Sequence, residues 1–426
     1  MKSVLLGASA LALSVGAAHA AGLDRSGQSV MAIFADDNTA NLSFGYVMPS
    51  VTGKDDLGND YDVGDAYSVI GLSYTNAINE QISYSVIFDQ PYGANVTYNN
   101  SPLTSALGGT GADLSSEALT FVGKYQISDR ISVFGGIKLE QVRADVALNG
   151  IAYRNAISTS AVTRGFNATR PGGTPALDAS LLGAAAAGSV PAATAIDTTY
   201  GAGTTAALGG QIATQAGSFA ANDGYKFSMD TDRRIGYVIG AAYEIPEIAF
   251  RLALTYSPEI EHKADTTEDI FGATVTGDVE YVTPQSVNIE FQTGIAPDTL
   301  LLATYRWTEF SAVDVVPTAL GSDLVNLNDG ERYTLGIGRR FNPNLSGSAV
   351  ISYEPEGDEL VSPLGPTNGL WGLSIGGQYT KDNVKLSGGI NYSWLGNAKP
   401  EVGGVAAADF ENNHSVAFGI RAEFAF

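Results

Sequence analysis

The chain has 426 residues, no cysteine and a formal net charge of −22, with 45 acidic side chains against 23 Lys and Arg. This acidity excludes nucleic acid as a partner, because proteins that bind it carry basic surfaces. The lack of cysteine excludes a disulfide scaffold. Although 44% of the residues are hydrophobic, beyond the N-terminal segment they never form the run of about 18 that a transmembrane helix needs.

The N-terminal segment has the pattern of a secretory signal peptide. Met1-Lys2 is a short positive start, Val4–Ala17 is apolar, and Ala18-His19-Ala20 is a cleavage site of the A-x-A type. Such a segment is removed on export, so residues 1–20 are predicted to take no part in the fold.

A short amphipathic segment precedes the first predicted strand. Within residues 21–41, Val30, Ile33 and Phe34 share one face of a helix, which Asp36 and its neighbours end. If the strands that follow close into a barrel, this apolar face needs a dry place, and the lumen offers one. The alternative is a frayed terminus in the periplasm.

Residues 42–426 are predicted to form strands whose connections alternate between long loops and short turns. The short turns fall at 76–79, 128–129, 245–247, 296–298, 342–344 and 381–383. The alternation places all long loops at one rim and all short turns at the other, which is typical of outer-membrane barrels. About 14 antiparallel strands result, an even number as in bacterial barrels of this kind.

The last strand, residues 414–426, has the clearest alternation. Val416, Phe418 and Ile420 share a face that is apolar throughout, while the opposite face is small or charged. Because the chain stops at Phe426, this edge stays exposed unless the first strand pairs with it. An apolar exterior predicts an all-β fold, a transmembrane antiparallel barrel with a small helical hatch in its lumen. The alternative is an edge strand of a soluble sandwich.

The loop at residues 149–226 is far longer than the others. Asp178 is placed to cap a helix that runs through Ala187, with Leu177, Leu181 and Leu182 as its apolar side. A loop of this length is usually functional or disordered. Helices that fold over the mouth of the barrel are expected, with disorder as the alternative.

The third predicted strand carries a proline where a barrel strand should be fully paired. Pro91 removes a ladder donor and Gly93 removes side-chain bulk, so the ladder is predicted to open between Gln90 and Gly93. An open ladder at membrane depth is tolerated only where it lines a protein cavity. The alternative is a simple bulge.

Four stretches resemble the FadL-type family of outer-membrane transporters for long-chain fatty acids and other hydrophobic compounds, which includes TodX-like channels. They are Ala21-Gly22-Leu23, residues 88–94, residues 252–256 and the closing strand that ends in Phe426. The resemblance implies residues 21–41 as a hatch in the lumen and residues 42–426 as the barrel. Residues 37–40, Asp-Asn-Thr-Ala, depart from the Asn-Pro-Ala motif that is frequent in the hatch of this family.

The resemblance also implies the site residues. Asp89, Gln90, Pro91, Tyr92 and Gly93 would form a lateral opening to the membrane, and the long loop with its three leucines would help to form an outer hydrophobic groove for substrate.

Arg143 matches a basic position of the family that meets the substrate carboxylate. It shares the parity of Ile137 and Leu139, which predicts a lipid-facing side chain. A bulge near residues 140–141 would turn it into the lumen, and both readings remain open from the sequence.

Residues 372–376 fit the G-x-S-x-G pattern of hydrolases, but they lie inside an alternating strand rather than on a strand–turn–helix elbow. We therefore expect neither an enzyme nor a metal site, and no cofactor.

These observations predict a passive, monomeric uptake channel in the bacterial outer membrane, in contact with its lipid. Long-chain fatty acids are the first expected cargo, and aromatic hydrocarbons are the alternative. A structural or adhesive barrel and a water-filled porin are the rival functions.

Overall fold

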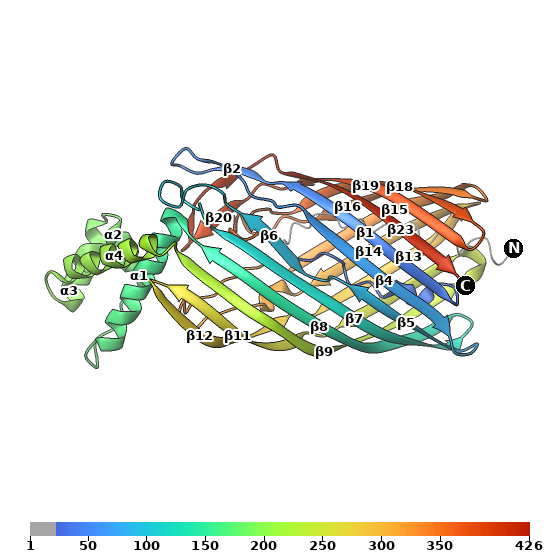
Figure 1. Ribbon diagram of the computed structural model, residues 1–426, viewed down its shortest axis with the longest axis horizontal. Helices are drawn as coiled ribbons and strands as arrows, with labels where there is room; N and C mark the ends of the chain where they lie inside the picture. The colour runs from blue at the N-terminus through green and yellow to red at the C-terminus, as the bar shows by residue number, and fades with distance from the viewer. Residues whose placement is uncertain (1–22) are drawn as a thin grey trace.

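The computed structural model describes residues 23–426, which form one closed antiparallel barrel (Figure 1). The wall has 14 strands, which confirms the predicted fold class. Three of these strands are interrupted, so that each is made of two elements: β5 with β6, β10 with β11, and β12 with β13. The predicted signal peptide, residues 1–20, lies outside the described residues.

The wall strands follow one another in chain order. Their bounds are β1 (Thr39–Ser50), β4 (Tyr67–Ala77), β5 (Ile82–Asp89), β6 (Gly93–Thr97), β7 (Gly111–Ser128), β8 (Ile131–Leu148), β9 (Tyr225–Ile245), β10 (Phe250–Ser257), β11 (Ile260–Ile270), β12 (Ala273–Thr283), β13 (Ser286–Ala296), β14 (Thr299–Thr308), β15 (Gly330–Asn342), β16 (Leu345–Glu354), β18 (Leu370–Lys381), β19 (Val384–Leu395) and β23 (His414–Ala425). Short strands lie in the long loops: β2 (Thr52–Lys54), β3 (Asp60–Asp62), β17 (Leu360–Val361), β20 (Lys399–Val402), β21 (Val405–Ala406) and β22 (Asp409–Phe410).

Pairing between the first and last strands closes the barrel. β1 pairs with β23 along its whole length, from Thr39↔Ala425 to Ser50↔His414, and pairs with β4 on its other side. The terminal strand is therefore no free edge, because its backbone groups are paired with β1 and β19.

The polarity of the barrel is reversed relative to a soluble protein. Large apolar side chains are exposed on the outside of nearly every strand, such as Phe44, Ile137, Ile239, Ile337 and Phe418. Charged and amide side chains are instead buried in the lumen, which fits a barrel whose outside meets lipid.

Four helices fill the longest loop: α1 (Gly150–Thr169), α2 (Ala179–Ala186), α3 (Val190–Tyr200) and α4 (Thr204–Ala221). They gather at the end of the barrel opposite the end of β23 (Figure 1). α2 begins directly after Asp178, whose carboxylate accepts hydrogen bonds from the backbone N–H groups of Ser180 and Leu181 at 2.7 and 3.2 Å. No helix among the described residues is long and apolar enough to span a membrane.

The N-terminal segment before β1 lies inside the barrel. Its 3₁₀ helix η2 (Met31–Phe34) follows Val30, and both Val30 and Ile33 are buried against inward-facing residues of the wall. These wall residues are Ile87, Val122, Phe134, Val238, Ala242 and Ala253. Of the three predicted apolar residues, Val30 and Ile33 are thus buried in the half of the lumen nearer the short turns, and Phe34 packs against the same cluster. We call residues 23–38 the lumen segment.

Candidate functional site

A cavity of about 390 Å³ lies in the half of the lumen nearer the long loops. Its size falls within the range of about 300–1,000 Å³ that is usual for sites of small ligands. The lining is mainly apolar and includes Val142, Phe227, Met229, Trp307 and Phe310. An apolar ligand that replaces water there therefore gains free energy mainly from the burial of apolar surface.

The charged side chains that line this cavity are all acidic. The lining includes the four acidic residues Asp329, Glu331, Glu354 and Glu356, whereas no Lys, Arg or His is found among the described lining residues. The nearby Arg332 lies 3.5 Å from Glu354 and is engaged in that ion pair. A ligand carboxylate would thus meet negative charges without a counter-ion, at a cost in free energy.

The lumen segment forms the floor of the cavity. Leu23 and Tyr92 line it from below. Tyr92 is 5% exposed, its hydroxyl accepts a hydrogen bond from Gln28 Nε2 at 2.6 Å, and it donates to the Pro284 carbonyl at 3.5 Å. The floor therefore ties the lumen segment to the third wall strand and to the opposite wall.

A buried ion pair anchors the same segment to β13 and β14. Arg306 donates to the carboxylate of Asp24, and its Nη1 donates to Asn288 Oδ1 at 3.0 Å. Asn288 in turn donates to the carbonyl of Gly27 at 2.9 Å. These contacts hold the segment across the lumen.

The ladder on the β4 side of the third wall strand is interrupted at the predicted place. Its last regular pair is Leu72↔Phe88, and the two strands meet again only at the single bridge Gly64↔Val96. Within the interruption, Gln90 Oε1 accepts a hydrogen bond from Ile70 N at 2.9 Å. A side chain thus satisfies part of the backbone that the kink leaves unpaired.

We call this interruption, at residues 89–93, the first break. The lumen segment fills it from inside. Arg25 N donates to the Pro91 carbonyl at 2.8 Å, and Gly93 N donates to the Leu23 carbonyl at 2.9 Å. The guanidinium of Arg25 lies 3.9 Å from the centre of the Tyr67 ring. A Cβ atom at Gly93 would lie 2.3 Å from Arg25 Cζ, so glycine makes room for the guanidinium to cross the break.

Arg143 points outward and does not line the cavity. Its Nε donates to Ser115 Oγ at 2.9 Å on the outer surface. The bulge that could have turned it inward lies in the neighbouring strand, where Asp230 and Thr231 stand opposite Arg143. The alternation of β8 therefore continues unshifted from Ile137, and the expectation that Arg143 meets a carboxylate in the lumen is not supported by its position.

The three leucines of the long loop also lie away from the cavity. Leu177 and Leu182 are buried in a cluster with Val162, Ile196 and Leu208, and Leu181 packs against it. This cluster is the core of the α1–α4 cap, so burial within the cap explains these residues without a ligand.

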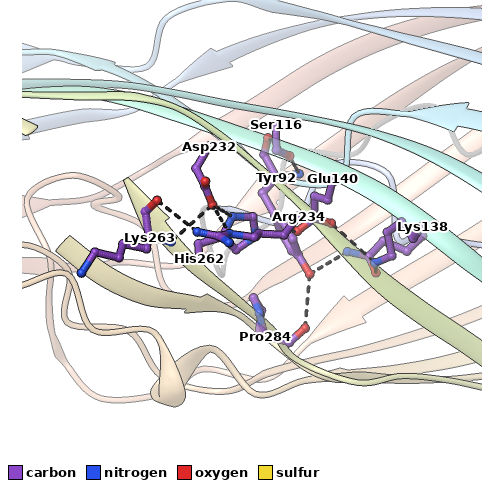
Figure 2. A network of polar contacts seen from close by, with 10 residues as sticks. Tyr92, Ser116, Lys138, Glu140, Asp232, Arg234, His262, Lys263 and Pro284 are labelled. Atoms are coloured by element: carbon purple, nitrogen blue, oxygen red, sulfur yellow. Dashed lines mark hydrogen bonds and ion pairs between the residues drawn. The ribbon is translucent and has the colours of Figure 1, made fainter. Parts of the chain in front are cut away.

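Sequence reasoning did not single out a polar network behind the cavity wall (Figure 2). His262 Nδ1 lies 3.0 Å from Asp232 Oδ2, and its Nε2 lies 3.7 Å from Glu140 Oε1. The imidazole stacks on the ring of Tyr281, with centroids 4.9 Å apart. Tyr281 lines the cavity, so its ring separates the imidazole from a ligand.

The network continues downward to the lumen segment. Lys138 Nζ lies 3.5 Å from Glu140 Oε2 and donates to Gln28 Oε1 at 3.1 Å. The inward parity of Lys138 and Glu140, between the lipid-facing Ile137 and Leu139, is a sequence signal that could have revealed both.

The G-x-S-x-G stretch, residues 372–376, lies within β18 and pairs regularly with β16 and β19. It makes no nucleophile elbow. Within residues 23–426, no group of three or more His, Cys, Asp or Glu side chains could hold a metal ion.

Comparison with known proteins places the chain among membrane transporters. The family profile described as "Outer membrane protein transport protein (OMPP1/FadL/TodX)" matches residues 12–402. No curated protein matches the sequence. Among solved structures, a Pseudomonas aeruginosa FadL homologue has a TM-score of 0.65 at 11% identity and covers 92% of this chain and 91% of its own.

Two further structures have the same fold. The Pseudomonas putida toluene transporter TodX has a TM-score of 0.57 at 14% identity, covering 96% of this chain and 98% of its own. The Ralstonia pickettii toluene transporter TbuX has a TM-score of 0.55 at 12% identity, covering 92% and 90%.

Proposed function

The chain belongs to the OMPP1/FadL/TodX family of outer-membrane transport proteins, and on that premise we propose that its cargo is a neutral hydrophobic molecule of the size of a small aromatic hydrocarbon. Members of this family are transport channels for hydrophobic compounds and not enzymes. The observation that carries the proposal is the composition of the cavity lining, which is apolar with four carboxylates and, among the described residues, no cation.

This choice replaces the long-chain fatty acid that was expected first from the sequence. A hydrogen bond to a charged group contributes roughly 1.5–3 kcal/mol, and a fatty acid would forgo that contribution here. The residue expected to supply it, Arg143, faces outward. TodX and TbuX are toluene transporters, and toluene is a neutral aromatic cargo.

The proposed route begins at the long-loop rim, enters the cavity and leaves sideways through the first break, formed by Asp89, Gln90, Pro91, Tyr92 and Gly93. Val30, Ile33 and Phe34 block the straight path below. A lateral exit keeps the cargo in apolar surroundings, and each CH₂ group that avoids water saves about 0.8 kcal/mol. One chain suffices for this route, because a single barrel encloses the cavity, so a monomer is the proposed unit.

Trp307 offers a direct test because it lines the cavity, whereas the other two tryptophans, Trp371 and Trp394, are exposed outside. A Trp371→Phe/Trp394→Phe protein would leave Trp307 as the reporter of binding. Toluene and methyl oleate should quench its fluorescence, and oleate should do so at least tenfold more weakly than methyl oleate. Tighter binding of oleate than of its methyl ester would refute a neutral cargo.

A further inference from the structure

The barrel wall has a second interruption, between β9 and the strand formed by β10 and β11. Below it, the last ladder pair is Tyr256↔Ile239. Above it, pairing resumes at Thr266↔Met229 in the same overall register. The residues between these pairs, on both strands, have no ladder partner across this boundary. We call this region the second break.

Each strand carries one extra residue at one end of the second break. In β9, two outward residues, Asp230 and Thr231, separate the inward Met229 and Asp232. In the partner, Pro258 and Glu259 separate Ser257 and Ile260, which both face inward.

Between the two extra residues, the inward and outward alternation of one strand is out of phase with that of the other. Residues that the common register would place opposite each other then point to different sides of the wall. A regular antiparallel pair needs them on the same side. The ladder therefore cannot form within the second break without a change of register, and Pro258 could not donate to it in any case.

The two breaks stand at matching positions above the short-turn rim. In each case the ladder stops at the seventh residue of the strand that follows a short turn, Phe88 in β5 and Tyr256 in β10. The lower part of the second break is flanked by Ile235 and Tyr237, which are 63% and 59% exposed on the apolar outer surface. The second break thus adjoins the lipid-facing belt.

Side chains, not backbone pairs, hold the second break closed (Figure 2). Asp232 Oδ2 accepts a hydrogen bond from Lys263 N at 3.3 Å, and Arg234 Nη2 donates to the Lys263 carbonyl at 3.3 Å. On the lumen side, Ile260 covers Gly236 so closely that a Cβ atom there would lie 2.4 Å from Ile260 Cδ1. Such contacts can be exchanged by rotamer changes, whereas a ladder cannot.

The cavity lies directly behind these side chains. Met229, at the upper end of the second break, lines the cavity, as does Val142, which pairs with Asp232. His262, which contacts Asp232, is covered by the cavity-lining ring of Tyr281. The cavity therefore reaches the upper end of the second break at Met229, and the side chains of Tyr281 and His262 lie between it and Asp232.

We propose that the second break is a second lateral portal, through which hydrophobic cargo passes between the cavity and the membrane when Ile260 and the Asp232–Lys263 contact move aside. This inference rests on the proposed lateral release of cargo. It adds a portal that is separate from the first, because four wall strands, β5 with β6, β7, β8 and β9, lie between the two breaks.

The absence of cysteine from the chain allows each portal to be sealed separately. In an Ile235→Cys/Glu261→Cys variant, both thiols lie on the outer surface, one on each side of the second break. The matched control, Ala241→Cys/Leu254→Cys, is an outward pair in the regular β9–β10 ladder. Both would be bridged in cells with a short bifunctional thiol reagent, and uptake of radiolabelled toluene would be measured.

Bridging the second break should lower toluene uptake at least twofold, and bridging the control pair should leave it unchanged. In a protein whose first break is sealed by Pro91→Val, Tyr92→Thr and Gly93→Val, bridging the second break should stop the remaining uptake. Unchanged uptake after complete bridging, in either background, would overturn the second portal.

A second measurement does not depend on transport. A maleimide carried on a phospholipid acyl chain cannot leave the bilayer, and it should label Ile260→Cys but not Ala253→Cys, which faces the lumen within the regular ladder. Absence of labelling at Ile260→Cys would refute the portal even if toluene uptake is normal. Labelling without any toluene uptake would support the portal and count against the proposed function.

Discussion

Phe34 anchors the lumen segment through its ring, and its replacement should release that segment. The ring packs edge-on against Phe134 with centroids 5.7 Å apart. Lys124 Nζ lies 4.7 Å and Arg251 Cζ lies 4.6 Å from the centre of the same ring. Two cations therefore share one aromatic side chain at the lower end of the lumen.

The magnitude follows from these three contacts. Each cation–π contact at a partly exposed site contributes about 0.5–1 kcal/mol, and an aromatic pair adds about 0.5–1.5 kcal/mol beyond its buried area. Phe34→Leu keeps an apolar side chain of similar size and removes all three contacts. A loss of about 2 kcal/mol raises the population of the undocked segment roughly 30-fold.

The assay is the conductance of single channels in planar bilayers, where undocking opens a water path through the lumen. Phe34→Leu should raise the fraction of time spent in conducting states by more than tenfold, while Phe34→Trp should leave it near wild type. Met31→Leu, in the same 3₁₀ helix, is the matched control and should also behave like wild type. Equal conductance of Phe34→Leu and wild type would refute the anchoring role of the ring.

Three further predictions concern the first break and one outer loop. Replacing Pro91-Tyr92-Gly93 with Val-Thr-Val should leave a folded barrel, seen as heat-modifiable migration on gels, and should lower toluene uptake; unchanged uptake would show that the first break is not an exit. Arg25→Gln should raise uptake, because the guanidinium that fills this break is lost, and a decrease would contradict this. Burial opposes ionisation of Asp55, but hydrogen bonds from Ala106, Tyr61 and Asn59 outweigh it, so its pKa lies below the ordinary value. A carboxyl with a depressed folded-state pKa stabilises the fold above its unfolded pKa, and this stabilisation is lost as the pH falls through the folded value. Proteolysis of the loop at residues 52–62 should therefore accelerate below about pH 4, and the same rate for wild type and Asp55→Asn at neutral pH would contradict this.

Local patterns were enough to predict the barrel and its first break. Alternation places Phe418 outside and its neighbours inside whatever the partner strand is, because the side-chain period of a strand is two. Pro91 cannot donate to a ladder in any fold, so an interruption near it followed from the residue alone. The apolar side of the lumen segment, Val30 and Ile33, is also a local feature, and it lies buried in the lumen.

Other features depend on which strands meet and where they shift. Arg143 faces outward because the bulge beside it lies in β9, a strand separated from it by the whole long loop. The second break arises because β9 carries its extra residue at the upper end of its pairing with β10 and β11, while the partner strand carries its own at the lower end, at Pro258. The sign of charge around the cavity likewise depends on side chains gathered from distant loops, such as Asp329 and Glu356. By itself the sequence determined the alternation of side chains, the placement of long loops and short turns at opposite rims, and the kink in the third strand. Each of these follows from single strands and their connections. Only the tertiary structure decided register, facing and cavity charge, because each of these is a relation between strands that the chain order does not contain.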